Sequence, residues 1–231
     1  MTRRLRGLSA AVAACTVVVV VGGTAASAGP TIVLGAAKPA KASCPQACLV
    51  EADVTGFQTS IGKLRNPFSV PGGGEVVAWS IKLGKPQKKD RKAFNEEFGP
   101  SRARIAILRK VPKKGRPPRY KLLRQSPLEN LGQFFGSTTT FSLTKPLPAR
   151  NKDIVALTIP SWAPSFAVGQ SSQTRWRASR RATEKRGGCT VEGGFANVEA
   201  GAPQQKKGTQ RPYGCVYDTA RLLYSATFVA E

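Results

Sequence analysis

The sequence of 231 residues contains no histidine, one methionine and few aromatic residues. Without histidine the chain cannot form a Ser-His-Asp triad, a Cys-His pair or a histidine-ligated metal site. Its longest early apolar run, residues 8–21, is shorter than the roughly 20 residues that span a bilayer. These absences exclude the commonest hydrolase chemistry and leave only carboxylates as candidate catalytic groups.

The N-terminal segment nevertheless has the three parts of a secretory signal. They are a basic start, the apolar run and a small-residue cleavage site: Arg3, Arg4 and Arg6, residues 8–21, and Ala26-Ser27-Ala28. We expect residues 1–28 to be a signal peptide that is cleaved after Ala28, and the mature chain to be exported without a transmembrane segment. A permanent membrane anchor is the alternative, and the short run disfavours it.

Acidic residues are scarce, with 13 Asp and Glu against 36 Lys and Arg, which gives a formal net charge of +23. Removing the three arginines of the leader leaves +20 on the mature chain. Such a charge favours association with anionic polymers or surfaces. The alternative is a soluble protein of a basic proteome, in which the charge serves only solubility.

Of the five cysteines, Cys15 lies in the leader and four remain in the mature chain. An even number of cysteines in an exported protein indicates disulfides. We predict the pairs Cys44–Cys48 and Cys189–Cys215, because near neighbours close most easily, and two other connectivities stay open. Zinc is disfavoured by the single short spacing and the lack of histidine, so no metal or cofactor is expected.

Short segments of alternating apolar and polar residues dominate the chain and are typical of an all-β fold. We predict a flexible tether over residues 29–43 and a single antiparallel β-sandwich over residues 44–231, with one short helix at residues 86–98. The expected strands are residues 76–83, 102–109, 120–124, 138–143, 153–159, 174–179 and 221–230.

Two details of this prediction can be checked. Val77, Trp79, Ile81 and Leu83 should share the inward face of their strand. Pro160 should end the strand before it, because proline cannot donate a ladder hydrogen bond.

Four segments carry a resemblance to known proteins: Ala103-Arg104-Ile105-Ala106-Ile107-Leu108-Arg109, Tyr120-Lys121-Leu122-Leu123-Arg124-Gln125-Ser126-Pro127, residues 146–159 and Trp176-Arg177-Ala178-Ser179. Over residues 70–231 the chain resembles secreted bacterial β-sandwich proteins of jelly-roll type, which have no assigned function. Where those proteins often have Gly-Asp before the central strand, this chain has Asn151-Lys152-Asp153, and Asn151 is expected to take the left-handed conformation. The resemblance implies the fold and export, and no substrate.

The candidate binding residues are one tryptophan and several cations. Trp162 lies between Pro160 and Pro164, where a rigid exposed indole could stack on a sugar. Burial of the indole over the end of the sandwich is the interpretation that we favour. Phosphates or uronates could be bound by arginines on one strand face and by a basic, proline-rich loop. These cations are Arg175, Arg177, Lys113, Lys114, Arg116 and Arg119.

Glu51 and Asp53 could form a catalytic pair, because alternate strand residues share a face with Cα atoms about 6.6 Å apart. We consider a solvated strand face the better interpretation. The sequence therefore predicts a secreted, non-enzymatic β-sandwich that binds anionic or saccharide polymers of the cell envelope and no specific nucleic acid. The alternatives are a carbohydrate-active enzyme that uses the carboxylate pair and a structural or interaction protein.

Overall fold

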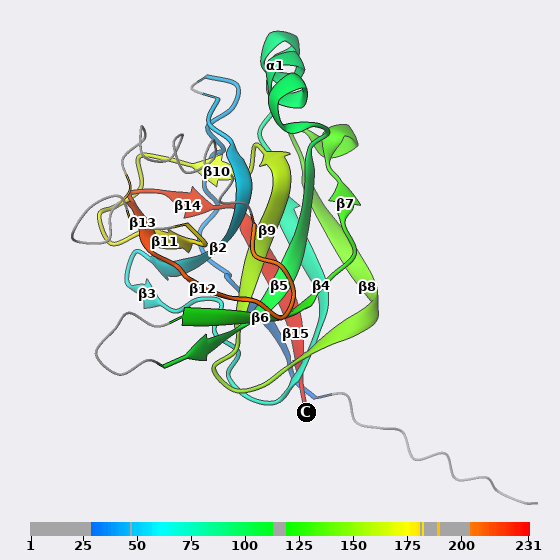
Figure 1. The fold of residues 1–231 in the computed structure, drawn as a ribbon, viewed down its shortest axis with the longest axis vertical. Helices are drawn as coiled ribbons and strands as arrows, with labels where there is room; N and C mark the ends of the chain where they lie inside the picture. The colour runs from blue at the N-terminus through cyan, green and yellow to red at the C-terminus, as the bar shows by residue number, and fades with distance from the viewer. Residues whose placement is uncertain (1–28, 47, 113–118, 181, 183–188, 190–203) are drawn as a thin grey trace, which may run out of the picture.

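The computed structural model describes residues 29–46, 48–112, 119–180, 182, 189 and 204–231. The signal peptide predicted for residues 1–28 lies outside these residues. Two antiparallel sheets form a sandwich (Figure 1), and the smaller has the strand order β1-β15-β4-β8. Its strands are β1 (Thr31–Leu34), β15 (Tyr224–Ala230), β4 (Gly74–Lys82) and β8 (Thr138–Ala149).

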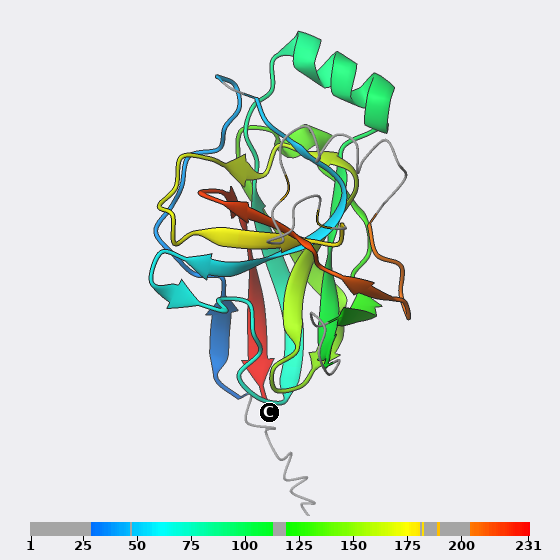
Figure 2. The ribbon, with the colours of Figure 1, turned by 60° about the vertical axis from the view of Figure 1, so that its left-hand side comes forward.

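The larger sheet contains nine strands, and seven of them follow the order β12-β6-β5-β9-β2-β11-β13. These are β12 (Gln210–Pro212), β6 (Arg119–Gln125), β5 (Arg102–Val111), β9 (Ile154–Ala163), β2 (Glu51–Ile61), β11 (Arg175–Ala178) and β13 (Cys215–Asp218). Short strands β3 (Leu64–Arg65) and β7 (Glu129–Asn130) pair with β2 and β5. A separate ribbon joins β10 (Phe166–Ala167) to β14 (Arg221–Leu222). In Figure 2, β11 runs crosswise to β15.

The main core lies between the two sheets and follows the alternation of the sequence. Ile105, Ile107 and Trp176 project inward from the larger sheet and are fully buried. Trp79 and Phe228 face them from the smaller sheet, also fully buried. The prediction of an antiparallel β-sandwich is confirmed, and its stability comes mainly from the apolar area buried between the layers.

A second, smaller cluster packs on the outer face of the larger sheet. Phe57, Tyr120 and Tyr213 form its aromatic part, with ring centroids 5.0–5.3 Å apart. Ala106 and Leu108 lie beneath them, fully buried, so the middle of β5 is covered on both faces. The outer face of this sheet is therefore partly buried, which a simple inward-outward alternation does not predict.

Two of the expected strand details are corrected. A register shift between Val76 and Ala78 turns the first half of β4, so Val76 is buried and Val77 is only half-buried. Strand β9 also continues through Pro160 to Ala163 instead of ending at Ile159. The register with β2 shifts at this level, since Ala52 lies opposite Trp162 and Val54 lies opposite Ile159. Pro160 therefore falls in a bulge of β9, where the ladder does not need its missing N–H.

The segment predicted as a tether is partly structured. Thr31–Leu34 form β1, which pairs with β15 as an edge strand of the smaller sheet. Of the four side chains of β1, only that of Leu34 is buried, at 5% exposure. The apolar alternation over four residues is too short to stand out in the sequence, and the open edge of β15 supplies the hydrogen bonds that order it.

The predicted helix is confirmed over Lys88–Phe98, labelled α1, with Gly99 following it at φ 76°. Figure 1 shows α1 at the end of the sandwich opposite the C terminus. None of its residues is fully buried. The described helices include none that is long and apolar enough to cross a membrane.

Both predicted disulfides are confirmed. Cys44 is bonded to Cys48, and Cys189 is bonded to Cys215. Cys215 is completely buried on β13, where it lies opposite Ala178 of β11. The longer bridge therefore ties a distant part of the chain to the edge of the larger sheet.

Candidate functional site

Trp162 is not an exposed platform for a sugar, and its burial at the end of the sandwich agrees with the other interpretation of the sequence. Its side chain is completely buried, and its Nε1 donates to Asn95 Oδ1 at 3.0 Å and to the Gly99 carbonyl at 2.9 Å. The rings of Phe94 and Phe135 lie 5.0 and 5.3 Å from it. The indole joins α1 to the end of the larger sheet, because its apolar body fills the gap while its N–H finds carbonyl-type acceptors.

The two candidate arginines of β11, Arg175 and Arg177, lie in different surroundings. Arg175 is exposed and forms an ion pair with Asp218, Nε to Oδ1 2.7 Å. Arg177 is half-buried and donates through Nη1 to the Tyr213 carbonyl at 3.0 Å. Only Arg177 lines a pocket on the outer face of the larger sheet.

Of the four cations predicted in the basic, proline-rich loop, only Arg119 is among the described residues. Lys113, Lys114 and Arg116 lie outside the described residues. Arg119, at the start of β6, donates to the Gln210 carbonyl at 2.7 Å and so joins β6 to β12. Arg119 is therefore engaged within the sheet and does not line that pocket.

The pocket beside Arg177 has a volume of about 790 Å³, and we call it the basic pocket. Strands β2, β5, β6, β9 and β11 and two neighbouring turns supply its wall, so residues far apart in the sequence meet there. They are Phe57, Thr59, Asn66, Ser69, Arg109, Lys110, Pro112, Tyr120, Asn151, Lys152, Asp153, Ile154 and Arg177.

Four cations and one carboxylate line the basic pocket, and the carboxylate is already neutralised. Asp153 is 1% exposed and accepts two hydrogen bonds from Arg109, Nε to Oδ1 and Nη2 to Oδ2, both at 2.7 Å. The Arg150 backbone N–H adds a third at 3.0 Å. The hydrogen bond to Asp153 raises the pKa of Arg109, which keeps the pair ionised. Lys110, Lys152 and Arg177 remain as positive charges with no anion among the lining residues.

Backbone strain also marks this pocket. Asn66 and Lys152 have φ values of 49° and 67°, in the left-handed region that non-glycine residues rarely adopt. Strain of this kind persists where the surrounding structure enforces it, and it is concentrated at functional sites. Lys152, and not Asn151 as expected, takes the left-handed conformation, because its N–H donates to the Val70 carbonyl at 2.8 Å.

The sequence pointed to Arg177 but missed Arg109, Lys110 and Lys152. Arg109 ends a predicted strand, Lys110 begins the basic segment after it, and Lys152 lies in the turn before another strand, so each had a simple local interpretation. Lys152 is more than forty residues from Arg109 and Lys110, and this separation gives no local signal. A bidentate partner for Asp153 could have been suspected only after β5 and β9 were paired.

The expected pair of carboxylates does not lie on a regular strand. Asp53 has φ 43° where the register between β2 and β9 shifts, so the alternation that would place it beside Glu51 is interrupted. Glu51 is 7% exposed, whereas Asp53 is half-buried. Neither residue lines the basic pocket.

Glu51 lies in an unusual electrostatic environment. Burial raises its pKa from 4.5 to about 7, and the positive charge of Arg180 partly opposes this effect. Arg180 is itself buried, and it donates to the Ala52 carbonyl and to the Tyr217 hydroxyl. Burial likewise raises the pKa of Asp53. A buried carboxyl of this kind couples the stability of the fold to pH.

Glu51→Gln is expected to change the pH dependence of unfolding. The carboxyl holds its proton more tightly when folded, so its contribution favours the folded state at low pH and is lost as pH rises from 4.5 through about 7. At roughly 1.36 kcal/mol per pKa unit, the ionised carboxylate costs the native state about 3 kcal/mol above that range. The variant should therefore gain about 2–3 kcal/mol relative to wild type between pH 5 and pH 8.

Denaturant unfolding of both proteins at the two pH values measures this difference. Glu96→Gln on α1, where the side chain is 67% exposed, is the matched control. Parallel stability profiles for Glu51→Gln and wild type would contradict the assignment.

Comparison of the chain with protein-family models, with curated proteins and with solved structures finds no match. The class of protein is thus defined by the fold alone, as an antiparallel β-sandwich with two disulfides. Among the residues the structure describes, no group of three or more Cys, Asp or Glu side chains is arranged to hold a metal ion.

Proposed function

We propose that this protein is an exported, non-enzymatic binding module and that its basic pocket holds an anionic polymer, such as an acidic polysaccharide of the cell envelope. The observation that carries the proposal is the excess of positive charge in the pocket. Asp153 is neutralised by Arg109, while Lys110, Lys152 and Arg177 have no anionic partner among the lining residues. A ligand that brings carboxylate or phosphate groups would supply the missing charge.

Other lining groups suit a sugar or phosphate chain. Asn66, Asn151 and Thr59 offer amide and hydroxyl hydrogen bonds, and Phe57 and Tyr120 provide an apolar aromatic wall. Ligand sites commonly combine an apolar surface with a few fixed polar groups. Export is supported by the leader sequence and agrees with two disulfides, which persist outside the reducing cytosol.

The test compares binding of heparin, polygalacturonate and neutral dextran to wild type and to an Arg177→Gln, Lys152→Asn double variant. Asparagine is chosen because it tolerates the left-handed conformation of Lys152. Hydrogen bonds to charged groups contribute about 1.5–3 kcal/mol each, so the double variant should bind the anionic polymers at least about ten-fold more weakly. Its salt dependence should also become shallower, because fewer counterions are released.

Arg175→Gln is the matched control, since Arg175 lies two residues from Arg177 on the same strand but outside the pocket. It should leave the affinity within about two-fold, as expected for an exposed, screened pair. If the Arg175→Gln control and the double variant lost the same affinity for the anionic polymers, the polymers would be attracted to the whole basic surface and not to the pocket. Equally tight binding of dextran would contradict an anion site.

A further inference from the structure

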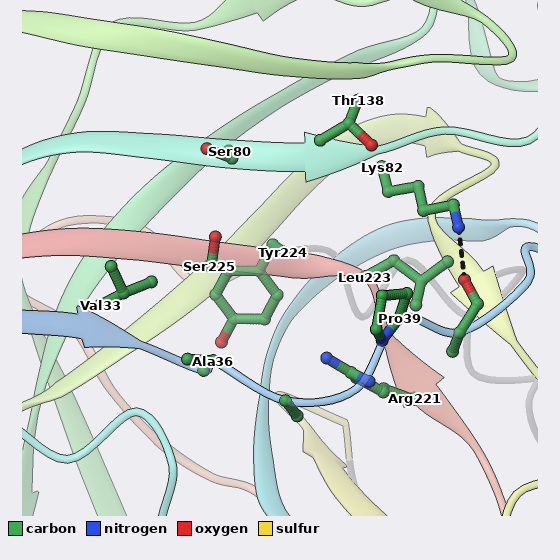
Figure 3. A pocket seen from close by; sticks show the side chains of 13 residues that line it. Val33, Ala36, Pro39, Ser80, Lys82, Thr138, Arg221, Leu223, Tyr224 and Ser225 are labelled. Carbon is green, nitrogen blue, oxygen red and sulfur yellow. Dashed lines mark hydrogen bonds between the residues drawn. The ribbon is translucent and has the colours of Figure 1, made fainter.

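A second cavity, separate from the basic pocket, lies beside β15 and is covered by the segment that follows β1. It has a volume of about 190 Å³ and is bounded by residues 35–40 on one side and by β4, β14 and β15 on the other (Figure 3). Its wall is mostly apolar, with Val33, Leu223 and Tyr224, and three hydroxyl side chains, Ser80, Thr138 and Ser225, complete it. The cavity is open to solvent on one side, and its volume is large enough for a small organic molecule.

Two cations tie the covering segment to the sheet. Lys82 Nζ donates to the Ala40 carbonyl at 2.7 Å, and Arg221 Nη1 donates to the Lys38 carbonyl at 2.6 Å. Figure 3 shows the Arg221 guanidinium extending past Pro39 toward Tyr224, while Lys82 turns away on the far side of Leu223. Both cations line the cavity, and the guanidinium of Arg221 is the one directed toward Tyr224.

Arg221 is buried without a counter-ion. It is 7% exposed, its Nε has no hydrogen-bond partner in the described part of the chain, and none of the residues that line the cavity is acidic. Burial lowers its pKa, and no neighbouring acid offsets that effect. Removing a cation from water is costly unless an anion or several hydrogen bonds compensate it, and among the described residues only the carbonyl of Lys38 accepts a hydrogen bond from Arg221.

We propose that this cavity binds a small organic carboxylate, with the carboxylate on Arg221 and the apolar body against Leu223, Val33 and the ring of Tyr224. A planar carboxylate matches the fork of a guanidinium, and its charge supplies the missing counter-ion. The ring of Tyr224 is a rigid wall, because its hydroxyl donates to the Val155 carbonyl at 2.9 Å and its face stacks on Phe68 with centroids 4.0 Å apart. This site is independent of the basic pocket and of the function proposed for it.

The experiment titrates benzoate, benzamide and inorganic phosphate into the whole mature protein and follows backbone amide shifts by NMR. Benzoate should bind saturably at one site, with shifts confined to residues 33–40, 80–82, 138 and 221–225. Benzamide, which has the same size without the charge, should bind at least ten-fold more weakly. Phosphate should not reproduce the benzoate shifts, because it has no apolar group to pack against the apolar wall of the cavity.

Variants separate the cavity from general attraction to a basic protein. Arg221→Lys should weaken benzoate at least three-fold, since it keeps the charge but loses the fork, and Ser225→Leu should block binding by filling the cavity. Lys38→Gln is the matched control, because it removes a neighbouring charge whose side chain does not line the cavity.

Several results would overturn the proposal. They are benzamide binding as tightly as benzoate, benzoate shifts that map instead to Arg109, Lys152 and Arg177, and Ser225→Leu binding benzoate like wild type. If Arg221→Lys does not fold, the comparison of benzoate with benzamide and the Ser225→Leu result still decide the matter. Because the two sites share no residue, loss of one activity leaves the other measurable.

Discussion

Replacing Trp162 with alanine is expected to lower the free energy of unfolding by about 3–5 kcal/mol, the usual cost of removing a large buried aromatic side chain. Trp162 is completely buried, touches Phe94 and Phe135, and holds the Asn95 and Gly99 oxygens through its indole N–H. The variant would leave a cavity and two acceptors without their donor. Because α1 has no fully buried residue of its own, the helix should be lost first.

Guanidinium-induced unfolding, read by far-ultraviolet circular dichroism, measures the effect. Trp162→Phe is the informative companion, since it keeps an aromatic ring in the core while it removes the N–H and the smaller ring of the indole. It should recover more than half of the lost stability. A melting temperature unchanged in Trp162→Ala would mean that the indole is not part of the core.

The second large effect is expected from the bridge between Cys189 and Cys215. Removing it with a Cys189→Ala, Cys215→Ala variant should cost about 3–4 kcal/mol, because the chain-entropy model assigns that much to a loop of this length. The two cysteines are 26 residues apart, and Cys215 is completely buried at the edge of the larger sheet. The unfolded chain gains entropy when the loop opens, while the native state loses a fixed contact.

The matched control is the Cys44→Ala, Cys48→Ala variant, whose bridge spans a sequence separation of only 4. The same model predicts a loss of about 2 kcal/mol for this short loop. Equilibrium unfolding of both double variants without reductant tests the order of the two effects. A larger loss from the short bridge would contradict the loop-entropy explanation.

The strands were predictable where apolar alternation is long and uninterrupted. Strand β5 buries Ala103, Ile105 and Ile107 as its sequence indicates, and β15 buries Tyr224, Ala226 and Phe228 in the same way. Errors arose where the register between paired strands shifts, because the shift interrupts the alternation of the two faces. Val77 and Pro160 were both misplaced for this reason, because a bulge depends on the partner strand and not on the residue itself.

The sites were much less predictable than the strands. Arg177 could be proposed from strand alternation, but its partners in the basic pocket come from β5 and from the turn before β9. Trp162 had two interpretations that the sequence could not separate, because its burial depends on where α1 docks. The structure decides for burial, with Phe94 and Asn95 of α1 in contact with the indole.

The sequence by itself determined the antiparallel β-sandwich and the helix after β4, because hydrophobic period and turn residues are local properties of the chain. Cysteine spacing favoured the observed disulfide pairs but left two other connectivities open, which the structure decided. Only the tertiary structure decided which charges are compensated. Asp153 meets Arg109 across the pairing of β5 with β9, whereas Arg221 is buried where no lining residue is acidic. Charge compensation depends on distances between residues that are far apart in the sequence, and those distances exist only after the sheets have formed.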